Sequence, residues 1–199
     1  MKRIIVTFIF LANITIGLFA QSELFYYGDN GKKESFKIRK DKAIIKTKST
    51  TEAQALSKNA AFRSAYDVNY NWIIATIDTL QTKLNELNQR PDVVDATYAL
   101  EYFDGTLQYL TDRIFVEYKE GISMEKLFDE IGLSKNVETI ELFDSWSDIY
   151  LITLNVELGD ILKICQNLFE SGLCKSANPV FICETKPDNT YYSYQWQCH

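Results

Sequence analysis

Residues 112–133 read DRIFVEYKEGISMEKLFDEIGL, and within this stretch the hydrophobic pattern changes period. Apolar side chains first alternate with polar ones, which predicts a strand over residues 112–118. They then recur at helical spacing, which predicts a helix over residues 122–131 with Ser123 as its N-cap and Gly132 at its exit. A strand followed directly by an amphipathic helix is the first half of a βαβ unit.

The chain after this pair continues the same alternation. Apolar patterning predicts strands over residues 137–145, 149–155 and 178–184, and a helix over residues 158–172. The order is then βαββαβ, that of the ferredoxin-like split βαβ arrangement, in which two helices cover one face of a four-stranded antiparallel sheet. The sequence therefore predicts an α+β domain over residues 111–185 whose other sheet face is open to a partner.

The preceding residues, 21–110, predict a related but looser α+β domain. The expected elements are strands over residues 24–27, 34–39, 42–48, 70–78 and 93–103, and helices over residues 49–65 and 79–90. GDNGK at residues 28–32 has the composition of a hairpin turn. Strands and helices thus alternate twice in one chain, which indicates an internal structural repeat without convincing residue identity between the halves.

The first 20 residues have the pattern of a secretory signal peptide. Lys2 and Arg3 precede an apolar run that ends at Ala20, where we expect cleavage. A membrane anchor is the alternative, although polar residues interrupt the run. The sequence therefore predicts a secreted or periplasmic protein with no membrane association once the signal peptide is cleaved.

The charge of the chain argues against two classes of partner. Loss of Lys2 and Arg3 would lower the count of basic residues from 21 to 19 against 27 acidic residues, a formal net charge of about −8. A strongly acidic protein is repelled by phosphate groups. We therefore expect no nucleic acid partner and no anionic membrane surface as a partner.

Four cysteines lie near the end of the chain, at Cys165, Cys174, Cys183 and Cys198. Their spacing lacks the closely placed pairs that zinc sites require, so we predict no metal and no cofactor. In an oxidising compartment they could form disulfides, for which Cys165 with Cys174 is the favoured local pair, or remain buried thiols.

Catalytic residues are scarce. The single histidine is His199, where nothing downstream in the sequence would orient an imidazole for a serine or cysteine triad. Neighbouring carboxylates such as Asp129 and Glu130 fit a solvated face of an acidic protein better than an active site. The sequence predicts that the chain is not an enzyme.

Three stretches carry a resemblance to a known family: LTDRIFVEYKEGIS (residues 110–123), ILKICQNLFESGLCKSANPVFI (161–182) and PDNTYYSYQW (187–196). Together with the signal peptide, they resemble the amino-terminal propeptide region of secreted bacterial subtilisin-like serine proteases, the subtilases. Residues 186–199 resemble the start of the catalytic domain, with its proline, tyrosine, glutamine and tryptophan at Pro187, Tyr191, Tyr192, Gln195 and Trp196. Asp188 and Asn189 stand in swapped order, and Thr190 replaces the usual proline.

The resemblance implies a propeptide role without proteolysis, because no catalytic aspartate, histidine or serine block follows Trp196. A subtilase propeptide acts as folding chaperone and inhibitor of its protease: its sheet docks on the protease, and its tail enters the active-site cleft. The matching tail here is Cys183, Glu184, Thr185, Lys186, Pro187, Asp188 and Asn189. This tail could equally be a linker, and the chain could be a protease remnant or a stand-alone secreted binding module.

Overall fold

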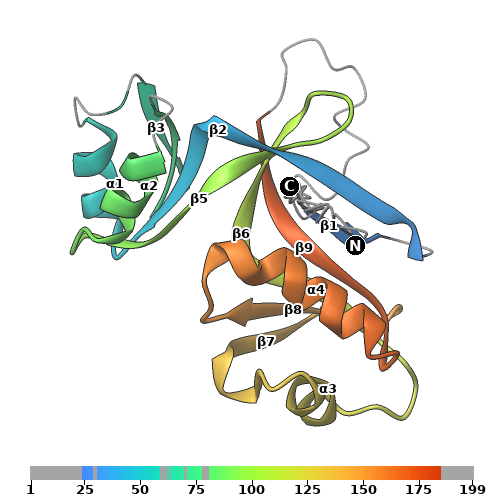
Figure 1. The fold of residues 1–199 in the computed structure, drawn as a ribbon. Coiled ribbons are helices and arrows are strands. Elements are labelled where there is room, and N and C mark those ends of the chain that lie inside the picture. Colours follow the sequence, from blue (N-terminus) through green and yellow to red (C-terminus); the bar gives the residue numbers. More distant parts are fainter. Residues whose placement is uncertain are drawn as a thin grey trace, which may run out of the picture.

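The computed structural model describes residues 24–28, 31–58, 62, 64–69, 71–77 and 81–184. The predicted signal peptide and most of the predicted tail lie outside these residues. The described residues form a mixed α+β structure in which nine strands belong to one connected, antiparallel sheet (Figure 1). This architecture confirms the predicted α+β class.

Two successive sets of elements can be distinguished in Figure 1, after the short strand β1 (Leu24–Tyr27). The first unit consists of β2 (Lys33–Thr47), α1 (Thr50–Ser57), β3 (Ser64–Asn69), β4 (Trp72–Thr76), α2 (Gln81–Asn88) and β5 (Val93–Glu101). The second unit consists of β6 (Leu107–Tyr118), α3 (Met124–Glu130), β7 (Val137–Asp144), β8 (Ile149–Leu154), α4 (Ile161–Glu170) and β9 (Cys174–Glu184).

The two units pair their strands in the same way. In the second unit the first strand, β6, lies between β9 and β8, and β7 pairs with the other edge of β8. In the first unit β2 lies between β5 and β4, and β3 pairs with the other edge of β4. The last strand of the first unit, β5, turns directly into β6 and pairs with it. The repeat that alternation indicated is therefore present in the strand pairing.

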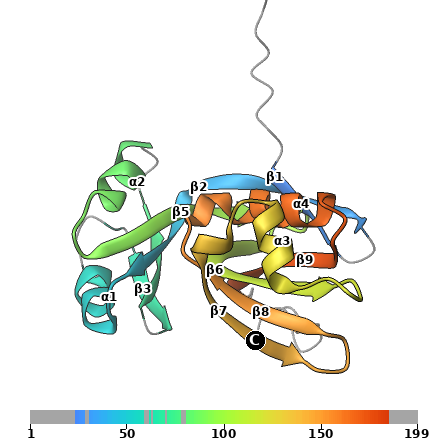
Figure 2. The ribbon, with the colours of Figure 1, turned by 90° about the horizontal axis from the view of Figure 1, so that it is seen from below.

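The core of the second unit lies between its strands and its two helices, which occupy one side of the sheet (Figure 2). Ile114 and Val116 of β6 and Ile152 of β8 point into this core and are 0% exposed. Leu127 of α3 and Leu168 of α4 meet them from the helix side, as the amphipathic patterns predicted.

The first unit has a separate core in which alanine packs with larger apolar side chains such as Ile45 and Ile73. Ala43, Ala75 and Ala96 of its strands pack with Ala53 and Leu56 of α1. A third cluster joins the units, because Ile44, Ile74 and Ala99 contact Tyr109 and Leu158.

Polar contacts also link the two units. Asp95 of β5 accepts a hydrogen bond from the backbone N–H of Leu158 at 2.5 Å. Lys46 of β2 forms an ion pair with Asp112 of β6. The contacts between the units therefore combine apolar packing with hydrogen bonds.

The hairpin of β1 and β2 packs on the second unit, which the sequence analysis did not predict. Tyr27 stacks on Phe169 of α4 with ring centroids 4.7 Å apart. Gln166 donates from Nε2 to the carbonyl of Phe25 at 2.5 Å. The predicted division between residues 110 and 111 stays a prediction, although contacts from residues before it reach the second core.

Two predicted elements of the first unit are wrong. The helix expected over residues 49–65 ends at Ser57, and residues 64–69 form β3, because pairing with β4 outweighs the helical propensity of this alanine-containing stretch. The strands expected over residues 34–39 and 42–48 are one strand, β2, with a register shift between Arg39 and Ala43. Such an irregularity lets a single strand pair with β1 at one end and with β4 at the other.

Candidate protein-binding surfaces

The predicted tail begins inside the last strand. Cys183 and Glu184 are the final residues of β9 and pair with Gln108 and Leu107 of β6. The other five tail residues, Thr185, Lys186, Pro187, Asp188 and Asn189, lie outside the described residues. The structure therefore shows only that the chain reaches residue 184 as an extended, sheet-bound strand.

The sheet face opposite α3 and α4 carries partly buried and exposed apolar side chains, and we call it the open face. Phe115 of β6 lies opposite Leu151 of β8, on the side away from the buried Ile114 and Val116. The ring of Phe143 lies 4.7 Å from that of Phe115 and is 56% exposed. These positions form an apolar patch that the described residues leave in contact with solvent.

The turn between β7 and β8 adds a further aromatic side chain. Trp146 is 96% exposed. The turn is tight, with Asp148 at a φ of 51° and the Asp144 carboxylate accepting from the backbone N–H of Trp146 at 3.0 Å. This hydrogen bond lowers the pKa of Asp144, so the carboxylate is ionised at neutral pH.

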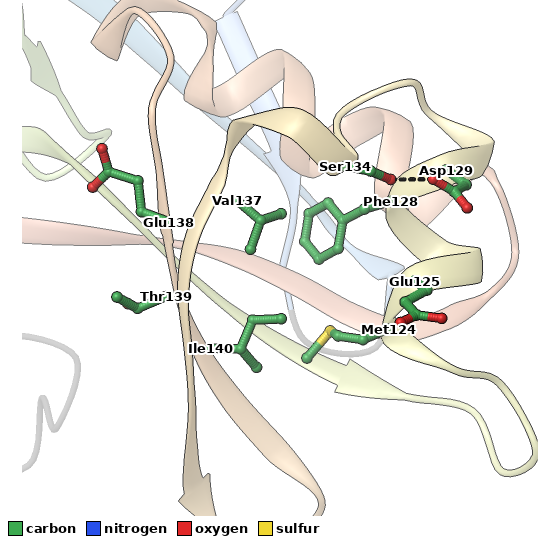
Figure 3. A pocket seen from close by; sticks show the side chains of 9 residues that line it. All are labelled: Met124, Glu125, Phe128, Asp129, Ser134, Val137, Glu138, Thr139 and Ile140. Carbon is green, nitrogen blue, oxygen red and sulfur yellow. Dashed lines mark hydrogen bonds between the residues drawn. The ribbon is translucent and has the colours of Figure 1, made fainter.

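A second surface lies between helix α3 and strand β7, and we call it the α3–β7 groove. It has a volume of about 570 Å³ and is lined by Met124, Glu125, Phe128, Asp129, Ser134, Val137, Glu138, Thr139 and Ile140. Figure 3 shows Val137 and Ile140 turned toward Phe128 and Met124, whereas Glu138 and Thr139 point to the other side of the strand. The groove thus has an apolar floor between a helix and a strand.

The lining of the groove also includes three acidic residues. Glu125 and Asp129 belong to α3, and Glu138 belongs to β7. Asp129 accepts a hydrogen bond from the hydroxyl of Ser134, which ties the end of α3 to the turn that precedes β7. The lining holds three carboxylates and no cationic side chain, so it favours positively charged ligands.

The predicted disulfide is not formed in the structure. Cys165 of α4 and Cys174 at the start of β9 are free thiols, both buried in the second core. Cys174 donates from Sγ to the carbonyl of Leu168 at 3.2 Å. Burial raises the pKa of Cys174 to about 11 and, with the nearby Cys174 sulfur adding to the effect, also raises the pKa of Cys165. Thiols in this state are poorly reactive.

Within the part of the chain that the structure describes, no group of three or more histidine, cysteine or acidic residues is placed to hold a metal ion. The same residues include no helix that is both long and apolar enough to span a membrane. The residues that do gather, in the groove and on the open face, are mainly apolar and acidic, as suits contact with another polypeptide.

Comparisons of the chain with protein-family models, with curated proteins and with solved structures found no match.

Sequence analysis did not predict the α3–β7 groove. One signal was present in ETIELF (residues 138–143), where Ile140, Leu142 and Phe143 are apolar without strict alternation. A strand buried on one side places its apolar residues at every second position, so apolar residues of both parities indicate two exposed apolar surfaces. All three side chains are at least 45% exposed.

Proposed function

We propose that this chain is a subtilase propeptide-like protein, a folding chaperone and inhibitor of a subtilisin-like serine protease with no catalytic activity of its own. The protease would be a separate chain. Residues 1–20 would direct export as a signal peptide, so both proteins would meet in the periplasm or outside the cell.

The strand order supports the ferredoxin-like part of this proposal. The strand order β9-β6-β8-β7 in the sheet, with α3 and α4 on one side, agrees with a split βαβ arrangement of the propeptide type. The order β5-β2-β4-β3 of the first unit agrees with the same arrangement. Because both sheets are joined through β5 and β6, the second unit is part of a larger sheet, and fold alone does not assign its function.

The apolar patch of the open face, in which the exposed Phe143 lies beside the partly buried Phe115, is the observation that carries the proposal. Phe115, Leu151 and Phe143 lie on the face that the helices leave uncovered. Burying them against a partner would remove apolar surface from water, which contributes about 25 cal/mol per Å². A propeptide sheet docks on its protease with this same face.

The end of β9 supports the inhibitory part of the proposal. The strand remains paired with β6 as far as Glu184. Thr185 to Asn189 follow this strand in the sequence and would enter the protease cleft as a substrate-like peptide.

An inhibition assay tests the proposal. The chain from Gln21 to His199 is added in tenfold excess to a subtilisin-like protease of the same organism, and hydrolysis of a peptide substrate is followed. We expect slower hydrolysis and a complex on gel filtration, and about tenfold weaker inhibition for Phe143→Ser or for removal of residues 185–199.

Leu142→Ser is the matched control for Phe143→Ser. Leu142 is 54% exposed, close to the 56% of Phe143, but it pairs with Tyr150 on the helix side of the sheet. We expect this control to inhibit as the unchanged chain does. Unchanged hydrolysis with no complex, or equal losses in both variants, would overturn the proposal.

The α3–β7 groove favours a second candidate, a stand-alone secreted binding module. An apolar groove with an acidic lining is suited to binding a peptide, whether or not a protease is present. A chain that binds peptides through the groove but leaves protease activity unchanged would support this candidate over the first.

A further inference from the structure

The floor of the α3–β7 groove is an apolar surface that the described residues leave open. Phe128 is nearly buried at 2% exposure, whereas Ile140 beside it remains 45% exposed. Figure 3 shows both side chains turned toward the space between helix and strand, together with Met124 and Val137. An apolar side chain placed here would gain contact with α3 and β7 at once.

Strand β7 adds backbone groups to this surface. It is the last strand on its side of the sheet, and among the described residues only β8 pairs with it. Every residue from Glu138 to Phe143 is exposed. An edge strand has backbone N–H and C=O groups that can pair with a further strand, and a peptide that binds in this way also places alternate side chains beside the sheet.

The charge of β7 decides which strand can join it. Between Val137 and Asp144 the acidic residues are Glu138, Glu141 and Asp144, and there is no lysine or arginine. A second copy of this chain, pairing β7 with β7, would bring acidic side chains against each other, which is unfavourable. Edge-strand charges of this kind prevent self-association and leave a basic strand as the complementary partner.

The charge of the groove lining also favours a basic ligand. Glu125 of α3 lies beside the floor and Glu138 lies on the other side of β7, whereas Lys126 of α3 and Lys135 of the following turn are not part of the lining. Ionised carboxylates with no cation between them attract a positively charged ligand, most strongly at low ionic strength.

We propose that the α3–β7 groove binds an extended peptide segment of a partner protein, one that alternates apolar and basic residues and adds a strand to the edge of β7. The apolar side chains enter the space between Phe128, Met124 and Ile140. The basic side chains face the carboxylates of Glu138 and its neighbours. The apolar side chains of the peptide lie on the helix side of the sheet, and its basic side chains lie on the side to which Glu138 points.

Binding of a capped synthetic peptide of alternating valine and lysine to the full chain tests the proposal. Fluorescence anisotropy measures the affinity at low and high salt, and hydrogen exchange reports on the backbone amides of β7. We expect binding that weakens with salt, slower exchange in Val137–Asp144, and no binding of the analogue in which glutamate replaces lysine.

Two pairs of variants locate the site. Ile140→Ser and Glu138→Lys should each weaken binding about tenfold. The controls are Val94→Ser and Glu86→Lys in the first unit, where Val94 has a similar exposure of 51% and Glu86 lies on α2. Both controls should bind within about twofold of the unchanged chain.

The outcomes are distinct. Loss of binding in Ile140→Ser and Glu138→Lys alone, with protection of β7, supports the proposal. Equal weakening by Glu86→Lys would mean attraction by net charge only, and this result overturns the proposal, as does equal binding of the glutamate peptide. None of these results depends on inhibition of a protease, so the two proposals fail separately.

Discussion

The first and second units share their order of elements and their strand pairings, but their first helices bury side chains of different size at a matched position. Four residues after the N-cap, α1 buries Ala53 and α3 buries Leu127, and both side chains are 0% exposed. The strands of the first core supply both small and large side chains, such as Ala43 and Ile73. The strands of the second supply Ile114 and Ile152. The same topology therefore accommodates different residues at a matched buried position.

The exposed surfaces of the units differ as well. In the second unit β7 leaves Ile140, Leu142 and Phe143 exposed. Among the strand residues of the first unit whose side chains are described, Val94 of β5 is exposed. Both proposed contacts use exposed side chains of β7.

The largest expected effect comes from exchanging the two matched core residues. Leu127→Ala would leave a cavity in the second core and should lower the free energy of unfolding by about 2–5 kcal/mol. Ala53→Leu would overpack the first core and should cost about 1–3 kcal/mol. Urea unfolding followed by circular dichroism measures both changes.

Leu142→Ala is the control for these substitutions, because an exposed side chain should change the free energy of unfolding by no more than about 0.5 kcal/mol. A neutral Ala53→Leu would show that the first core has room for the larger side chain. The comparison between a tightly filled site around Ala53 and a larger site around Leu127 would then be wrong.

An effect of intermediate size on the free energy of unfolding should appear at alkaline pH, and it should come mainly from the second unit. Burial raises the pKa of the Cys174 thiol from 9.0 to about 11. Between these values the thiol of the unfolded chain ionises and that of the native chain does not, so ionisation favours unfolding. The contribution of the buried, neutral Cys174 thiol to stability is fully present below pH 9 and is lost as the pH rises through 11.

Cys174→Ala isolates this contribution. The variant should lose less stability than the unchanged chain between pH 9 and pH 11 in urea titrations at each pH. Burial also raises the pKa values of Tyr98 and Tyr118, but both tyrosines remain in the variant and cancel in the difference. Burial raises the pKa of Cys165 as well, and because the Cys174 sulfur adds to that shift, removing Cys174 changes the Cys165 contribution in the same direction. Identical pH dependence in the two proteins would contradict the assignment to Cys174.

The sequence predicted the second unit more accurately than the first for a physical reason. The α4 segment carries a continuous apolar stripe, and Ile161, Leu162, Cys165 and Leu168 are all buried as that stripe requires. In the first unit, alanine gives little contrast between buried and exposed faces, so the sequence pattern did not show that α1 ends at Ser57. The helix expected over residues 49–65 was therefore too long and overlapped the start of β3. Residues 64–69 form a strand because they pair with β4, and the local sequence does not specify this pairing.

The candidate surfaces were less predictable than the fold. The alternating pattern of residues 114–116 places Phe115 on the other face of the strand from Ile114 and Val116, so an open face could be expected from the sequence. The groove depends on the distance between α3 and β7, two elements joined through a short 3₁₀ turn at Ser134–Asn136. No local pattern specifies that distance, because it results from how Phe128 packs in the core.

The smallest expected change in the free energy of unfolding comes from the matched N-caps of α1 and α3, which extend the comparison of the two units. Ser49 accepts at Oγ from the backbone N–H of Glu52 at 3.3 Å, and Ser123 accepts from that of Lys126 at 3.2 Å. Either serine replaced by alanine should lower the free energy of unfolding by about 0.5–2 kcal/mol. The caps differ in one respect, because Ser49 also donates to the Glu52 carboxylate at 3.1 Å. Lysine at the matching position of α3 offers no acceptor.

A double-mutant cycle separates the two caps. Ser49→Ala combined with Glu52→Ala should cost less than the sum of the single changes, by a few tenths of a kcal/mol or more, because each removes a partner of the other. Ser123→Ala combined with Lys126→Ala should be additive within about 0.3–0.5 kcal/mol. Additivity in both pairs would show that the Ser49 hydroxyl gains nothing from the Glu52 side chain. The first turns of α1 and α3 would then be held by the same single hydrogen bond to the backbone, and the two units would differ in their cores and exposed strands but not at their caps.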